Sequence, residues 1–100
     1  MGCAKSRLQI SGQINDKVVT YTPEPNIVFI TYSDFRGWAL QKFYKVSKTL
    51  HCTYSIKYMT KHDKIWKDVG ASEEIGHPYY IRLYQMTGKY HDFKFHYPYH

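Results

Sequence analysis

The side chains with the most specific chemistry in this 100-residue sequence are two cysteines, Cys3 and Cys52. A disulfide between them would close a loop of about 50 residues, which stabilises a small domain by roughly 4 kcal/mol in the chain-entropy model. An even number of cysteines in a short, strand-rich chain fits an oxidising, secreted environment. Two free cysteines, one at the terminus and one in the core, are the alternative.

The first six residues, MGCAKS, offer Cys3 a different chemistry, because they fit the pattern for N-myristoylation of Gly2. Cys3 would accept a palmitoyl chain, and Lys5 with Arg7 would add attraction to an anionic membrane. Acylation at both positions predicts a peripheral membrane protein, and a viral protein is one example of this class. Acylation excludes the disulfide, because a bridged Cys3 cannot be acylated. Met-Gly is also what recombinant expression leaves before a mature chain that begins at Cys3.

Positive charge is concentrated in one segment. Residues 42–67 hold seven lysines against one acid, so this segment accounts for the whole net charge of +6. It could bind an acidic protein, a nucleic acid or an anionic membrane, or be only a solvated surface. Only three of the 14 basic residues are arginine, the preferred residue for phosphate and base recognition, which argues against nucleic acid. The partner-binding residues predicted here are Tyr54, Lys57, Tyr58, Lys61, Lys64, Trp66 and Lys67.

Tyrosine is the most over-represented residue type, with 11 in the chain. A core this small cannot bury them all with their hydroxyl groups satisfied, so some must face solvent and supply rigid contact area. Ordinary cross-strand pairing is the alternative role. An exposed sheet edge could also accept a strand from a partner. The tyrosines considered for a binding surface are Tyr79, Tyr80, Tyr84, Tyr90, Tyr97 and Tyr99.

The six histidines invite a metal or ribonuclease interpretation, which the spacing does not support. On one face of a strand, His96 and His100 lie about 13 Å apart, too far for one ion. Nothing in the sequence brings His51, His62 and the acids at 73–74 together for acid–base catalysis. We find no phosphate-binding glycine loop and no nucleophile elbow. The sequence predicts a protein that is not an enzyme and needs no metal, cofactor or small-molecule substrate.

Alternation of apolar and polar residues predicts strands along most of the chain. The segment 38–50 is ambiguous, because its apolar positions also fit a short helix. Turn residues stand at 15–16 and 87–89, and 70–78 is the one long loop. The expected strands cover 8–14, 18–22, 27–32, 38–50, 52–58, 65–69, 79–86 and 90–97.

These strands predict an all-β fold, a small antiparallel β-sandwich of two sheets with one disulfide. Residues 1–100 form a single domain of about six strands, and the hairpin at 79–97 is an extension of it.

The chain resembles the MAX effector family, small secreted virulence proteins of plant-pathogenic fungi. The resemblance rests on Cys3 ahead of the first strand, on the mid-chain sequence LHC at 50–52, and on short strands from residue 3 to about 70. It implies a six-stranded sandwich tied by a disulfide that matches Cys3–Cys52. It also implies a non-catalytic effector that binds a host protein, such as a heavy-metal-associated domain or an immune receptor. Such a protein is secreted and acts in the host cytoplasm or apoplast.

Overall fold

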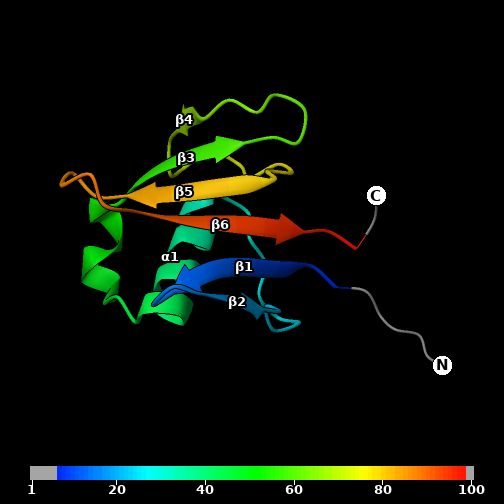
Figure 1. Ribbon diagram of the computed structural model, residues 1–100, viewed down its shortest axis with the longest axis horizontal. Helices are drawn as coiled ribbons and strands as arrows, with labels where there is room; N and C mark the ends of the chain where they lie inside the picture. The colour runs from blue at the N-terminus through cyan, green and yellow to red at the C-terminus, as the bar shows by residue number, and fades with distance from the viewer. Residues whose placement is uncertain (1–6, 99–100) are drawn as a thin grey trace.

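The computed structural model describes residues 7–98. Six antiparallel strands form one sheet in the order β2-β1-β6-β5-β3-β4, and one helix, α1 (Tyr32–Tyr44), lies behind this sheet in the view of Figure 1. A short 3₁₀ helix, η1 (Lys48–Thr53), follows α1. The strands are β1 (Gln9–Ile14), β2 (Lys17–Tyr21), β3 (Ser55–Met59), β4 (Lys67–Val69), β5 (Tyr80–Tyr84) and β6 (Tyr90–His96).

Both predicted turns are confirmed. Asn15 and Asp16 join β1 to β2 with φ angles of 50° and 69°, the two left-handed residues that a tight hairpin turn requires. Gly88, at φ 96°, turns the chain between β5 and β6. The C-terminal hairpin also forms, but it occupies the middle of the sheet, since β6 pairs with β1 and β5 pairs with β3. The hairpin at 79–97 is therefore the centre of the fold and not an extension of it.

The predicted strand at 38–50 is wrong, because most of this segment belongs to α1 and η1. A capping box starts α1: the Asp34 backbone N–H donates to Thr31 Oγ1, and the Asp34 carboxylate accepts from the Thr31 backbone N–H at 2.9 Å. At the other end, Lys45 takes a left-handed conformation and the Val46 N–H donates to Leu40 O, which closes the helix. These caps, together with apolar residues at helical spacing, favour a helix over a strand.

The predicted strand at 27–32 is also wrong. Residues 27–30 belong to no strand of the sheet, and Tyr32 already belongs to α1. The segment lies against the loop after β4: the Ile75 N–H donates to Ile30 O at 2.9 Å and the Tyr32 N–H to Glu73 O at 3.0 Å. Losing these two strands leaves too few for a second sheet. The small antiparallel β-rich fold is confirmed, whereas the two-sheet sandwich is wrong, because a helix forms the second layer.

Aromatic rings fill the space between α1 and the sheet. The Phe35 ring lies 5.5 Å from that of Phe93 and 5.0 Å from that of Phe95, and Phe43 lies 5.0 Å from Phe93. The glycine at position 12 of β1 makes room for this packing, since a Cβ there would stand 2.8 Å from the Phe43 ring. The helix therefore rests on the β1–β6 region of the sheet.

No disulfide is found in the part of the chain that the structure describes. Cys52 lies in η1 with an exposed, free thiol whose Sγ is 3.8 Å from Thr49 O. Its predicted partner, Cys3, lies outside the described residues, as does the Gly2 of the acylation pattern. The predicted Cys3–Cys52 bridge therefore stays a prediction, and Cys52 itself is exposed and not one of the buried core residues.

The first prediction concerns Gly12. Its replacement by alanine forces the Phe43 ring away from β1, and such overpacking lowers the free energy of unfolding by about 1–3 kcal/mol. Gly76→Ala is the matched control, because nothing lies within 4 Å of a Cβ at that position. Urea denaturation of both variants measures the difference. Equal stability of Gly12→Ala and the wild type would show that α1 does not sit this close to β1.

A second prediction concerns the helix cap. Thr31→Ala removes a side-chain acceptor from the start of α1 and lowers the free energy of unfolding by about 1 kcal/mol. The backbone N–H groups of Thr31 and Ile30 lower the pKa of Asp34. A carboxylate with a lowered pKa stabilises the fold above its usual pKa, and this stabilisation is lost as the pH falls through the folded value. Between about pH 5 and pH 2, the wild type should lose more stability than Asp34→Ala. Parallel pH profiles of the two proteins would contradict the capping box.

Candidate functional site

One face of the sheet is covered by α1, and the opposite face is not. Strand register defines this uncovered face, because residues directly opposite each other on neighbouring strands point the same way. Figure 1 views the sheet from this side. Two rows of residues cross this face: Thr20, Ser11, Lys94, Tyr80 and Met59 run from β2 to β3, and Asp92, Arg82, Lys57 and Asp68 run from β6 to β4.

A guanidinium stacked with two aromatic rings stands on the uncovered face. The Arg82 guanidinium carbon lies 4.3 Å from the centre of the Trp66 ring and 4.0 Å from that of Tyr90. Asp92 accepts from Nε and Nη2 of Arg82 at 2.7 Å and 3.0 Å, a two-point ion pair. Cation–π contacts and the ion pair fix all four side chains before any partner arrives.

A second ring beside this group is held in a similar way. The Lys57 ammonium lies 5.6 Å from the centre of the Tyr84 ring and 3.4 Å from Asp68 Oδ1, which also accepts from the Tyr84 hydroxyl at 3.3 Å. The aromatic rings of the uncovered face therefore stand beside cations that are already paired with carboxylates, Lys57 with Asp68 and Arg82 with Asp92.

A groove of about 550 Å³ runs across the uncovered face over β1 and β6, between Trp66 and Tyr80 on one side and Val18 on the other. Its floor near β1 is polar and rigid, since Ser11 Oγ lies 2.7 Å from both Thr20 Oγ1 and His96 Nε2. Val18 is three-quarters exposed, so an apolar group in the groove would gain contact there.

A second hollow, of about 850 Å³, adjoins this groove and shares Lys94 and His96 with it. Its lining contains five basic side chains, Lys61, His62, His77, Lys94 and His96, and among the described residues no carboxylate. We call these five residues the basic pocket. The ion pairs found in residues 7–98 involve neither Lys61 nor Lys94, so both ammonium groups are available to a ligand.

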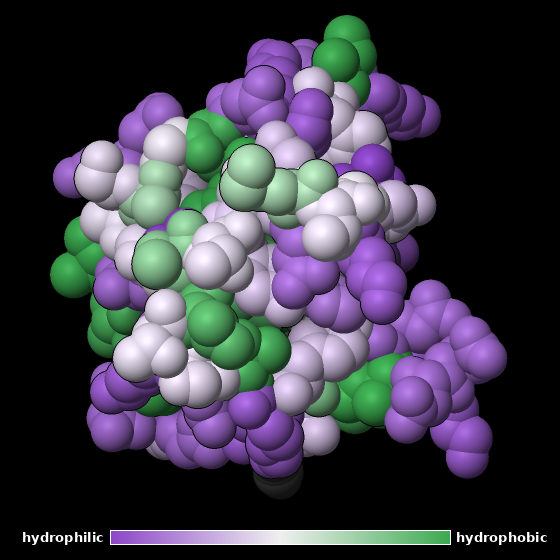
Figure 2. All heavy atoms as spheres, turned by 90° about the vertical axis from the view of Figure 1, so that its left-hand side faces the viewer, coloured by the Kyte–Doolittle hydropathy of each residue, from purple (hydrophilic) through white to green (hydrophobic). Residues whose placement is uncertain are grey.

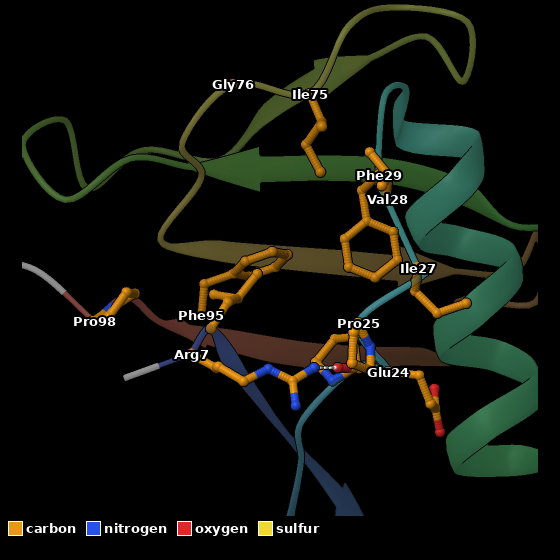
Figure 3. A pocket seen from close by; sticks show the side chains of 12 residues that line it. Arg7, Glu24, Pro25, Ile27, Val28, Phe29, Ile75, Gly76, Phe95 and Pro98 are labelled. Atoms are coloured by element: carbon orange, nitrogen blue, oxygen red, sulfur yellow. Dashed lines mark hydrogen bonds between the residues drawn. The ribbon is translucent and has the colours of Figure 1, made fainter. Parts of the chain in front are cut away.

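A third hollow, of about 430 Å³, is apolar and lies at the helix-covered side of the sheet (Figure 3). Phe29, Ile75 and Phe95 reach it from three separate segments, and Arg7 crosses below them with its guanidinium donating to Pro23 O. The Arg7 guanidinium is therefore already hydrogen-bonded to the protein's own backbone. This hollow can accept an apolar side chain, but it lies apart from the rings of the uncovered face.

The structure does not gather the seven residues predicted to bind a partner onto one surface. Lys57 and Trp66 lie on the uncovered face, and Lys61 lies beside it in the basic pocket. Tyr54 is buried on the helix-covered face, where its hydroxyl accepts from Gln85 at 2.9 Å. The half-buried Tyr58 packs on Tyr32, 5.7 Å away, also on the helix-covered face.

The other two predicted lysines lie at the start of β4 and in the turn region before it: Lys67 is the first residue of β4, and Lys64 precedes the strand. Lys67 pairs with Asp63 at 2.7 Å, and this contact raises the pKa of Lys67 and lowers that of Asp63. Lys64 is exposed, with a left-handed φ of 57°. Neither side chain reaches the stacked group around Arg82.

Sequence reasoning missed the residues that organise this face, Arg82 and Asp92. The signal was present in the C-terminal hairpin. Once its turn is placed at residues 87–89, Arg82 and Asp92 stand directly opposite each other. Opposite charges on facing positions of a strand pair indicate an ion pair. Tyr80, Tyr84 and Tyr90 were correctly considered as surface tyrosines, and they point to the uncovered face with Arg82.

Titratable groups on the other face are structural. Burial lowers the pKa of His91, whose ring stacks on Tyr44 at 3.9 Å. Burial also raises the pKa of Tyr32 to about 12. Because His91 loses its proton more readily and Tyr32 holds its own more tightly, both stay neutral at physiological pH. They serve the packing between helix and sheet.

Other parts of the surface offer less organised chemistry. No three described histidine, cysteine or carboxylate side chains come together as ligands for a metal ion. Within residues 7–98, no helix has the length and apolar character needed to cross a membrane. Figure 2 shows the end of the molecule that holds η1 and the β5–β6 turn, where hydrophobic side chains form several small areas separated by polar ones. The uncovered face, with its groove and the adjoining basic pocket, is the candidate site.

Comparisons with known proteins do not change this choice: no family model, no curated protein and no solved structure matches the chain. The resemblance to MAX effectors therefore stays a prediction.

The third prediction tests the preformed state of the site. A double-mutant cycle on Arg82→Ala and Asp92→Ala should give a coupling free energy of about 1 kcal/mol, because the pair makes two hydrogen bonds and is only partly exposed. The more exposed Lys67–Asp63 pair, which makes one hydrogen bond, is the control and should couple clearly less than the Arg82–Asp92 pair, because solvent screens it. Equal, near-zero couplings for both pairs would mean that the Arg82 group is not fixed in the free protein.

Proposed function

We propose that this chain is a non-catalytic binding module that holds an acidic segment of a protein partner on the uncovered face of its sheet. The observation that supports this most strongly is the stack of Trp66, Arg82 and Tyr90. Rigid aromatic rings and arginine are the side chains most enriched at protein interfaces and at their energetic centres. Because the ion pair with Asp92 already fixes the stack, binding does not have to order it.

Charge favours an acidic partner. The two carboxylates of the face, Asp68 and Asp92, are engaged by Lys57 and Arg82, whereas Lys94 and the neighbouring Lys61 have no acidic partner among the described residues. The face and its border therefore attract negative charge. An aromatic groove next to unpaired ammonium groups fits a segment in which apolar and acidic residues alternate.

A protein partner is favoured over a nucleic acid because Arg82, the arginine on this face, is already paired with Asp92. Nucleic-acid readers use free guanidinium groups for phosphates and bases and open ring faces for base stacking. Here Asp92 accepts from Nε and Nη2 of Arg82, and the Arg82 guanidinium lies over the Trp66 ring. A single strand would have to break these contacts before it could stack.

The resemblance to MAX effectors supplies the biological setting of the proposal, a secreted virulence protein that binds a host plant protein. It rests on Cys3, Cys52 and the short strands. The single sheet with a helix departs from the two-sheet sandwich of that family, so the setting has weaker support than the binding surface.

The fourth prediction tests the binding surface with a peptide of alternating glutamate and leucine. Titrated into isotope-labelled protein, it should shift the amide resonances of β1, β3, β5 and β6 and bind less tightly as salt is added. Trp66→Ala should weaken its affinity at least about tenfold, because a central aromatic anchor is lost. Lys57→Ser should weaken it less, since its charge is already shared with Asp68.

Two controls lie away from the face. Met86→Ala removes a fully exposed apolar side chain at the β5–β6 turn, and Lys48→Ser removes an exposed lysine from η1. Neither should change the affinity. Shifts confined to the helix-covered side, or equal losses in the controls, would contradict the proposal. Tighter binding of a single-stranded RNA of similar length than of the peptide would assign the face to nucleic acid instead.

A further inference from the structure

The basic pocket carries more specific chemistry than the rest of the binding surface. Lys61 and His62 come from the turn after β3, His77 from the loop before β5, and Lys94 and His96 from β6. Three separate segments thus place five basic side chains around one hollow of about 850 Å³. Like charges repel, so such a gathering is unfavourable in the free protein and becomes favourable when an anion binds.

Nothing in the described lining of this pocket neutralises these side chains. Lys94 is held 5.6 Å from the centre of the Tyr79 ring and 5.9 Å from that of Tyr80, contacts that orient its ammonium group without pairing its charge. The nearest acid in sequence, Asp63, is engaged by Lys67 at 2.7 Å.

The phenol at the back of the pocket also stays neutral. The Tyr97 hydroxyl donates to Pro78 O at 2.6 Å, and burial raises the pKa of Tyr97 above its usual value. A tyrosine with a raised pKa keeps its proton at physiological pH. Every charge that the described lining can carry is therefore positive.

We infer that the basic pocket binds a phosphoryl group carried by a side chain of the protein partner. Two ammonium groups and three imidazoles supply N–H donors from several directions, as a phosphate monoester with three free oxygens requires. The pocket shares Lys94 and His96 with the groove, so a peptide lying in the groove can place one side chain in the pocket. This inference rests on the proposed function, and it names the modification that the partner carries.

A phosphodiester fits this arrangement less well. A nucleic-acid backbone repeats its single charges along a track, whereas the lysines and histidines here are collected in one hollow at the end of the groove. A phosphate monoester concentrates close to two negative charges in one group.

The fifth prediction uses inorganic phosphate and a phosphoserine peptide as probes. Phosphate should bind saturably and shift the side-chain resonances of His62, His77 and His96. The double variant Lys61→Ser/Lys94→Ser should weaken phosphate binding at least about tenfold, because two charge-assisted contacts are lost. Lys89→Ser, at the exposed β5–β6 turn, is the matched control and should bind as the wild type does.

Sulfate, a dianion of nearly the same shape as phosphate, is a second probe and tests the contribution of the histidines. His77→Asn removes one imidazole from the lining, so it should weaken sulfate binding at constant pH. Sulfate affinity that is unchanged in His77→Asn would show that this imidazole does not contact the anion.

Each outcome has a distinct meaning. If the acidic peptide binds the uncovered face but phosphate, sulfate and the phosphoserine peptide gain nothing from the pocket, the inference is wrong and the proposed function stands. If phosphate binds the pocket but neither peptide binds the groove, the proposed function is wrong. Tighter binding of a phosphodiester oligonucleotide than of the phosphoserine peptide would overturn the inference. Equal loss of phosphate binding in Lys89→Ser and in the double variant would also overturn it.

Discussion

The close contact between α1 and the centre of the sheet determines what the rest of this protein can do. Phe35 and Phe43 pack on Phe93, and the contact is possible because β1 has a glycine where the helix comes nearest. One helix of 13 residues can cover only one face of a six-stranded sheet. Among residues 7–98 no helix covers the opposite face, which carries charged and aromatic side chains such as Arg82, Asp92 and Tyr90.

On the uncovered face, charged side chains keep aromatic rings in place. Arg82 stands between two rings and is fixed by Asp92, while Lys57 stands by Tyr84 and is fixed by Asp68. These acids pair with the cations in the middle of the face, whereas Lys61 and Lys94 of the basic pocket, at its border, have no acidic partner within residues 7–98. An aromatic centre with a charged border is the arrangement of a protein interface, in which the centre supplies affinity and the border orients the partner.

The sequence predicted the hairpins and the β-rich character of this fold well, because the Asn15-Asp16 turn and the alternation in β5 and β6 are local signals. It failed where local signals compete. The apolar positions of the segment 38–50 fit a strand as well as a helix, and the cap formed by Thr31 and Asp34, which marks the start of the helix, lies ahead of that segment. The site was predicted in part. Trp66 was predicted because it lies in the lysine-rich segment 42–67, but Arg82 and Tyr90, which stack with it, come from a hairpin far along the chain. Strand register, which the sequence does not show directly, brings them together.

The most direct measurement of the central claim is the accessibility of each face of the sheet in solution. A neutral gadolinium chelate, added to the labelled protein, speeds the relaxation of protons in proportion to their exposure. The side chains of Trp66, Tyr84 and Tyr90 should relax strongly, whereas those of Ile81, Phe93 and Phe95 should be protected by α1. Protection of both sets, at protein concentrations where the chain is monomeric, would show that the face is covered by the protein itself and would contradict its assignment as a binding surface.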